Sequence, residues 1–192
     1  MNKRSLILPV ILLLCMAFVG WHAYSPVNQY TSGGPAMDQL YAEAQRINDL
    51  PAGTPFTVTF SDDTLTQAAE EALSLYSADI KAALQKLASM EIDVAKPKVE
   101  FNGDGTLKLS AKAGKGFLKV GASAIARINL INGIPEIQVE KVDVPLISIS
   151  AETANSEIKN LTGQYMNYLT SFCSLSKIEI TDGQIAIEGI KN

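Results

Sequence analysis

The sequence has one histidine and two cysteines among its 192 residues, and these shortages exclude several kinds of chemistry. The histidine, His22, closes an apolar N-terminal run, so the rest of the chain has no imidazole base for a Ser-His-Asp or Cys-His pair. Cys15 and Cys173 belong to no disulfide framework and no metal-ligand spacing, and we interpret Cys173 as a buried small apolar residue. We therefore expect a protein that is not an enzyme, with no catalytic residue, no metal site and no cofactor.

Basic charge is also scarce. The chain has 16 Lys and Arg against 20 Asp and Glu, and because Lys3 and Arg4 precede every acidic residue, the later part has 14 basic and 20 acidic groups, or −6. A nucleic-acid-binding protein needs a basic face to neutralise phosphates, so that class is excluded. The one local exception is Lys112, Lys115 and Lys119. We interpret it as the solvated end of a hairpin, with contact to anionic lipid headgroups as the alternative.

Residues 1–24 contain the one long apolar run, which has no charge from Leu6 to Trp21. As a helix, residues 5–24 would span about 30 Å, enough to cross a bilayer core. Lys3 and Arg4 precede this run and no basic residue follows until Arg46, so the positive-inside rule predicts a cytoplasmic N-terminus. We predict an uncleaved signal-anchor in a bacterial cell envelope, and a cleaved signal peptide is the alternative.

The rest of the chain divides into a linker and one domain. Residues 25–53 combine a Ser/Gly/Pro-rich spacer with a short helical pattern over 37–50, either a stalk or a helix docked on the domain. Residues 54–192 are the predicted extracytoplasmic domain. Within it, apolar residues recur at steps of three and four over 64–90 and again over 152–172, which predicts two long amphipathic helices.

Between and after these helices the pattern indicates short strands. Alternating residues predict strands over 56–60, 92–94, 98–101, 107–113, 117–131, 134–144 and 146–150, and a closing hairpin over 178–189. Three Asx-Gly pairs, at 102–103, 132–133 and 182–183, predict tight hairpin turns. The fold class is therefore α+β: a curved, mainly antiparallel sheet packed against two long amphipathic helices, preceded by one transmembrane helix.

Two further segments bear on function. The run Glu100-x-Asn102-x-Asp104-Gly105 resembles the start of a calcium loop, but the twelfth position is Ala111, so we predict a hairpin turn. Residues 121–126 are mostly small, which leaves room beside a strand. Either a helix packs closely there, or the sheet lines a cavity for an apolar ligand.

The order of these elements resembles a known family. The chain has an N-terminal anchor, then "FTVTFSDDTLTQAAEEAL", "KPKVEFNGDGTLKLSAKA", a long strand pair, "VDVPL" before a helix, and a final "IEITDGQIAIEG". From about Phe56 to Gly189 it is similar to bacterial membrane-anchored domains related to the tubular lipid-binding superfamily, which includes bactericidal/permeability-increasing protein. The resemblance implies a curved antiparallel sheet wrapped around a long helix, with lipid chains in an apolar groove and no catalytic motif.

We therefore predict a single-pass protein of the cell membrane whose extracytoplasmic domain binds a lipid or another hydrophobic ligand without catalysis. Its expected partners are the lipid bilayer and a lipid ligand. The alternative is an accessory or scaffold subunit that docks on a membrane protein complex and holds no ligand. Residue type and helical or strand face select the candidates for the ligand lining: Tyr76, Ile80, Leu84, Ile125, Tyr165 and Leu169.

Overall fold

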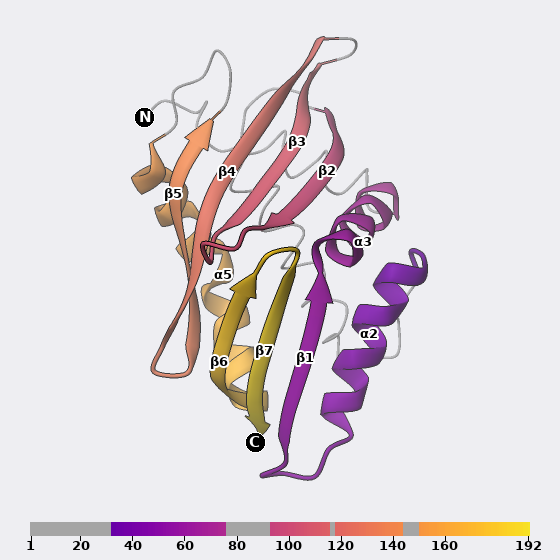
Figure 1. The fold of residues 1–192 in the computed structure, drawn as a ribbon, viewed down its shortest axis with the longest axis vertical. Helices are drawn as coiled ribbons and strands as arrows, with labels where there is room; N and C mark the ends of the chain where they lie inside the picture. Colours follow the sequence, from indigo (N-terminus) through magenta and orange to yellow (C-terminus); the bar gives the residue numbers. More distant parts are fainter. Residues whose placement is uncertain (1–31, 76–92, 116–117, 144–149) are drawn as a thin grey trace.

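The computed structural model describes residues 32–75, 93–115, 118–143 and 150–192, which form an α+β domain with two antiparallel sheets (Figure 1). One sheet has three strands in the order β1-β7-β6, and the other has four in the order β2-β3-β4-β5. The predicted α+β class with antiparallel pairing is confirmed. The helices are α2 (Pro35–Asn48), α3 (Asp62–Leu75) and α5 (Ala151–Phe172), and the strands are β1 (Pro55–Ser61), β2 (Asp93–Phe101), β3 (Leu107–Lys115), β4 (Leu118–Ile131), β5 (Ile134–Asp143), β6 (Cys173–Thr181) and β7 (Gln184–Lys191).

The four-stranded sheet is a meander in which each strand pairs with the next along the chain. The turn between β4 and β5 is the predicted Asx-Gly turn, with positive φ angles of 54° at Asn132 and 78° at Gly133. The turn between β2 and β3 has its positive φ at Gly105, and the amide of Asn102 donates to the carbonyl of Thr106 at 2.9 Å. The run that resembles a calcium loop is thus a hairpin turn, as predicted.

The three-stranded sheet joins the first strand of the described chain to the last two. β1 pairs along its whole length with β7, so that Phe56 lies opposite Gly189. The two sheets meet at the β6–β7 turn, where the amide of Gly183 donates to the carbonyl of Phe101 and the carbonyl of Gly183 accepts from the amide of Asp62, both at 3.0 Å. The prediction of a single curved sheet is therefore wrong. Because β1 pairs with β7, which lies more than a hundred residues later in the chain, β1, β7 and β6 form a sheet of their own.

Helix α3 begins at Asp62, directly after a serine whose side chain caps it. Ser61 Oγ accepts from the amide of Thr64 at 3.1 Å, which satisfies one of the free amides of the first turn. The helix predicted over 64–90 is observed as far as Leu75, and its remainder lies outside the described residues. Ser150 caps α5 in the same way. Because residues 76–92 and the side chains of residues 160–168 lie outside the described set, a pair of long amphipathic helices is not shown.

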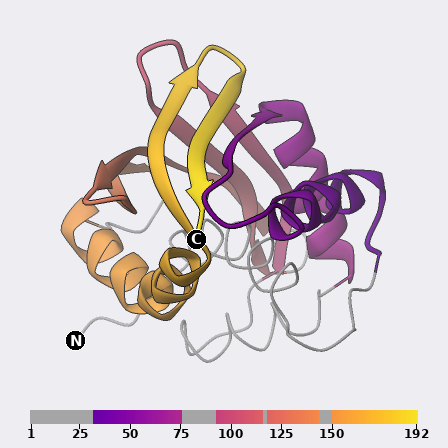
Figure 2. The same ribbon diagram turned by 90° about the horizontal axis from the view of Figure 1, so that it is seen from below.

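Helix α2 is docked on the domain, which decides between the two alternatives for the linker helix. Ala36, Met37 and Leu40 are buried in a small cluster with Ala68 and Ala72 of α3. Figure 2 shows α2 and α3 on one side of the molecule, α5 on the other, and the β6–β7 hairpin between them. A stalk standing free of the domain is therefore excluded for residues 35–48.

A carboxylate of α3 holds the start of α2. Glu71 Oε2 accepts from the amide of Met37 at 2.8 Å, and Glu71 Oε1 accepts from the amide of Ala36 at 3.3 Å. These are free amides of the first turn of α2, where the helix dipole also favours a negative charge. The N-terminal end of α2 is thus fixed beside the C-terminal end of α3.

None of the helices within the described ranges is long and apolar enough to cross a membrane. The transmembrane helix predicted within residues 1–24 lies outside those ranges.

Candidate functional site

The inner face of the four-stranded sheet carries a strip of short apolar side chains along its two central strands. We call this the inner strip: Leu109 and Ala111 of β3, and Ala122, Ala124 and Ala126 of β4. Each of the five is at most 7% exposed. The protein's own atoms therefore cover the strip, and a ligand would have to displace some of them to reach it.

Two helices flank the inner strip. α3 packs mainly on β2, and α5 packs mainly on β5, so each covers one outer strand of the sheet. Leu65 of α3, and Ala154 and Ile158 of α5, belong to the same hydrophobic core as the strip. The strip therefore forms a floor of short side chains between two helical walls.

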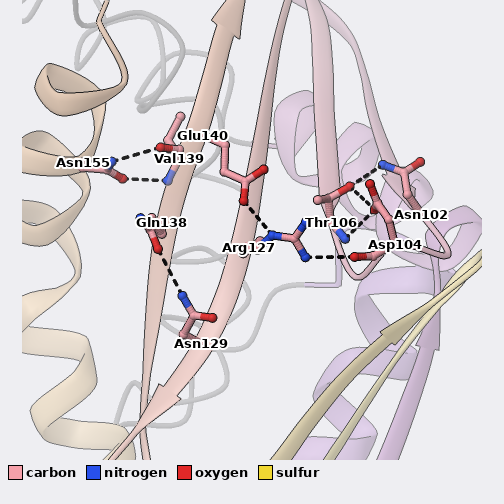
Figure 3. Close-up of polar contacts among 9 residues, drawn as sticks. All are labelled: Asn102, Asp104, Thr106, Arg127, Asn129, Gln138, Val139, Glu140 and Asn155. Carbon is pink, nitrogen blue, oxygen red and sulfur yellow. Dashed lines mark hydrogen bonds and ion pairs between the residues drawn. The ribbon is translucent and has the colours of Figure 1, made fainter.

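Each wall is joined to the sheet by one polar side chain. Thr66 Oγ1 of α3 accepts from the amide of Val99 at 2.9 Å and donates to the carbonyl of the same residue at 3.2 Å. Asn155 of α5 makes the equivalent pair with Val139: Oδ1 accepts from the amide at 2.6 Å and Nδ2 donates to the carbonyl at 3.0 Å (Figure 3). These bonds fix the helices at the outer strands and satisfy backbone groups that edge strands leave unpaired.

Close packing applies on the α5 side of the floor. Ala126 of β4 and Ala154 of α5 are both 0% exposed within one core cluster, and the two Asn155 bonds draw the helix against the edge of β5. Small side chains permit this approach. On this side of the strip, the small residues over 121–126 allow a helix to pack closely, which was the first of the two interpretations.

Four of the six predicted ligand-lining side chains cannot be placed. Residues Tyr76, Ile80 and Leu84 lie outside the described residues, as does the side chain of Tyr165. Leu169 is half-buried near the C-terminal end of α5.

Ile125 lies away from the inner strip. Because side chains alternate along β4, it projects on the opposite face from Ala124 and Ala126, and it is half-buried there. In the ladder it stands between Lys108 of β3 and Lys141 of β5. The structure therefore does not bring Ile125 together with the floor.

The outer face around Ile125 is polar and holds the hairpins in register. Arg127 Nε lies 2.6 Å from Glu140 Oε1, and Arg127 Nη1 donates to the carbonyl of Asp104 at 2.8 Å (Figure 3). The Thr106 hydroxyl and then its amide donate to the carboxylate of Asp104, which lowers the pKa of Asp104. Every charged group in this network has a partner within the network. The network therefore has the features of a structural contact that links the β2–β3 turn to strands β4 and β5.

Metal-ligand groups and the thiol of Cys173 are two features of the described residues that bear on chemistry. No group of three His, Cys, Asp or Glu side chains among them lies close enough to hold a metal ion. Cys173 is buried, as predicted, and desolvation raises the pKa of its thiol. A thiol in that state is a poor nucleophile.

Thr66 and Asn155 were not among the predicted site residues. Thr66 follows Leu65 at the edge of the apolar stripe of α3, and Asn155 lies in the second turn of α5. The signal that marks them is a short hydrogen-bonding side chain near the buried face of a helix. Such a side chain points to a specific backbone partner, but the pattern does not say which strand supplies it.

No known protein family model and no curated protein matches this chain. The case for its function therefore rests on its own residues.

Proposed function

We propose that this protein is anchored in the cell membrane by residues 1–24 and binds a lipid or another apolar ligand in its extracytoplasmic domain, without catalysis. The observation that supports the proposal is the inner strip, a floor of four short side chains and one leucine between α3 and α5. The ligand's acyl chain would lie along this floor. Each methylene transferred from water would contribute about 0.8 kcal/mol, which gives affinity without a polar contact.

The finer features of the fold belong to the same proposal. We propose that α3 continues through residues 76–90 as one wall of the groove, with Tyr76, Ile80 and Leu84 along it, and that Tyr165 and Leu169 of α5 form the other. In the tubular lipid-binding superfamily, which the order of elements in the sequence resembles, a long helix and a sheet likewise enclose lipid chains.

The proposal is tested by filling the floor. In Ala124→Leu, a larger side chain occupies the centre of the strip, and Ser123→Leu adds a leucine to the outer face of the same strand as a matched control. Native mass spectrometry of the full chain, released from detergent, should detect a bound lipid in the wild type and in Ser123→Leu and none in Ala124→Leu. Absence of lipid from the wild type would overturn the proposal. So would equal lipid binding in the folded Ala124→Leu variant.

A second candidate function is docking on a membrane protein complex as an accessory subunit. The observation that favours it is the tip of the β4–β5 hairpin, where Ile131 is 50% exposed and its cross-strand partner Ile134 is 42% exposed. Two exposed isoleucines side by side are an apolar contact point. A stable partner that co-purifies with the full chain, is lost in Ile131→Ser/Ile134→Ser, and comes with no lipid would favour this function over the first.

A further inference from the structure

The inner face of the four-stranded sheet is covered unequally along its length. Beside the β2–β3 turn, one row of residues paired across the four strands is apolar, and each member is at most 3% exposed: Phe101, Leu107, Ala126 and Val139. Side chains alternate along β4, so Val120, six residues before Ala126, lies on the same face. Val120 is 38% exposed. The apolar face is therefore closed beside the β2–β3 turn and reaches solvent at Val120.

Both helices are joined to the sheet near its closed end. Thr66 of α3 bonds to the backbone of Val99, which lies one row away from Phe101. Asn155 of α5 bonds to the backbone of Val139, in the closed row itself. Figure 1 shows the end of β3 and the start of β4 at the opposite end of this sheet, away from the β6–β7 hairpin. The hydrogen bonds of Thr66 and Asn155 thus fix the helices at the end of the sheet remote from Val120.

Each outer strand has a bulge between these hydrogen bonds and the open end. In β2 the register shifts between Ala95 and Lys98, and in β5 it shifts between Val139 and Lys141. A bulge leaves a residue unpaired and bends its strand. The part of the sheet that carries Val120 is therefore separated from both helix contacts by an interruption of the outer ladders.

We infer that the ligand of the inner strip is an amphiphile with a single acyl chain, and that the chain enters past Val120 while the polar head stays at that open end. The inference rests on the proposed function. Because the protein's own atoms cover the strip, entry requires the sheet and the helices to part. Parting at the open end leaves the hydrogen bonds of Thr66 and Asn155 intact, whereas parting at the closed end would break them.

The chemistry of the two ends sets the orientation of the ligand. The closed row consists of apolar side chains, so a polar head placed there would lose its hydration without gaining a partner. At the open end the head remains in water. The inner strip occupies two neighbouring strands, which lie about 4.8 Å apart, and this width suits one hydrocarbon chain and not two side by side.

The experiment follows the exchange of bound lipid by native mass spectrometry of the full chain, released from detergent. Deuterated oleic acid is added to the protein, and its mass replaces that of the resident lipid as exchange proceeds. Val120→Trp places a larger apolar side chain across the open end. We expect the exchange rate to fall about tenfold or more, and tenfold corresponds to about 1.4 kcal/mol in the activation free energy. Ile131→Trp makes the matched change at the exposed tip of the β4–β5 hairpin and should leave the rate unchanged.

A label applied to the folded protein repeats the test without altering how the chain folds. In a Cys15→Ser background, in which Cys173 is buried, Val120→Cys and Ile131→Cys are each modified with a bulky maleimide. The label at position 120 should slow exchange, and the label at position 131 should not.

The outcomes separate this inference from the proposed function. A wild type with no bound lipid would overturn the proposed function and the inference together. If the wild type holds a lipid that oleic acid does not replace, the assignment to single-chain amphiphiles is wrong although the domain binds lipid. If the bulky groups at positions 120 and 131 have equal effects on exchange, the entrance is not at Val120, and the proposed function still stands.

Discussion

Thr66 and Val99 exchange two hydrogen bonds, and through them helix α3 occupies the open edge of β2. Thr66 Oγ1 accepts from the Val99 amide at 2.9 Å and donates to its carbonyl at 3.2 Å. Asn155 does the same for Val139 at the other edge of the four-stranded sheet. One side chain on each helix thus blocks an edge of the sheet that would otherwise be available to pair with another strand.

Replacing Thr66 by valine keeps the shape of the side chain and removes both hydrogen bonds. Val99 is buried, so its amide and carbonyl would lose their partner without access to water, and we expect a loss of about 1–3 kcal/mol in the free energy of unfolding. Urea denaturation measures this loss, and hydrogen exchange should accelerate at the Val99 amide. Thr59→Val, at an exposed position of β1, is the matched control and should change the free energy little. Equal effects of the two substitutions would contradict the role of Thr66.

Glu71 is expected to hold α2 on the domain. In Glu71→Ala the amides of Ala36 and Met37 lose their acceptor, and a lost cap of this kind costs about 1 kcal/mol. We expect faster hydrogen exchange across residues 36–47 and earlier proteolysis there. Glu70→Ala removes the neighbouring exposed carboxylate and should leave both rates unchanged. If exchange in α2 is the same in the two variants, the cap does not hold the helix.

The ion pairs of Glu100 predict an acid-dependent loss of stability. Hydrogen bonds from Lys98 and then Lys108 hold the pKa of Glu100 below its ordinary value. A carboxyl whose pKa is lower in the folded state stabilises the fold fully above its unfolded value, about 4.3, and this contribution disappears as pH falls through the lower folded value. Wild type should therefore be more stable than Glu100→Gln at pH 7, and the difference should close below about pH 4.

Urea midpoints of both proteins across this pH range measure the difference. Glu136→Gln, at an exposed position of β5, controls for the loss of one surface charge. A gap between wild type and Glu100→Gln that stayed constant down to pH 2 would refute the ion-pair explanation.

Two glycines in different surroundings should respond oppositely to alanine. A Cβ at Gly189 would stand 2.7 Å from Phe56 Cζ and 2.8 Å from the Ser174 carbonyl, so Gly189→Ala must displace the ring or the β6 backbone, at a cost of about 1–3 kcal/mol. Gly121 has no described neighbour within 4 Å of the same position. Gly121→Ala should therefore be neutral or stabilising by up to about 1 kcal/mol, because alanine restricts the unfolded chain. Thermal unfolding of the two variants compares them directly.

The parts of the fold that were predictable are those encoded over a few residues. Asn132-Gly133 specifies a turn by its own backbone preferences, and the strands on either side follow from period-two alternation. The start of α3 is encoded in the same local way by Ser61. The pairing of β1 with β7 was not predictable, because two strands more than a hundred residues apart carry no mark of their partner.

The candidate site was only partly predictable for a related reason. Small residues over 121–126 predicted either a closely packed helix or a cavity, and the alanines among them are buried in the core. Ile125, in contrast, was selected by residue type, and alternation along β4 turns it to the polar face, where Lys108 and Lys141 flank it. Hydrophobic character alone does not say which face of a strand is inside.

The sequence by itself determined the α+β class, the hairpins and the acidic charge balance, because each depends on composition or on neighbours along the chain. Tertiary structure alone decided the division into two sheets, the docking of α2 on α3, and the recruitment of Thr66 and Asn155 to opposite edges of one sheet. Those outcomes depend on which parts of the chain, far apart in sequence, come into contact. A polar side chain on a helix acquires its role only when the fold brings an unpaired backbone group within hydrogen-bonding distance, about 3 Å.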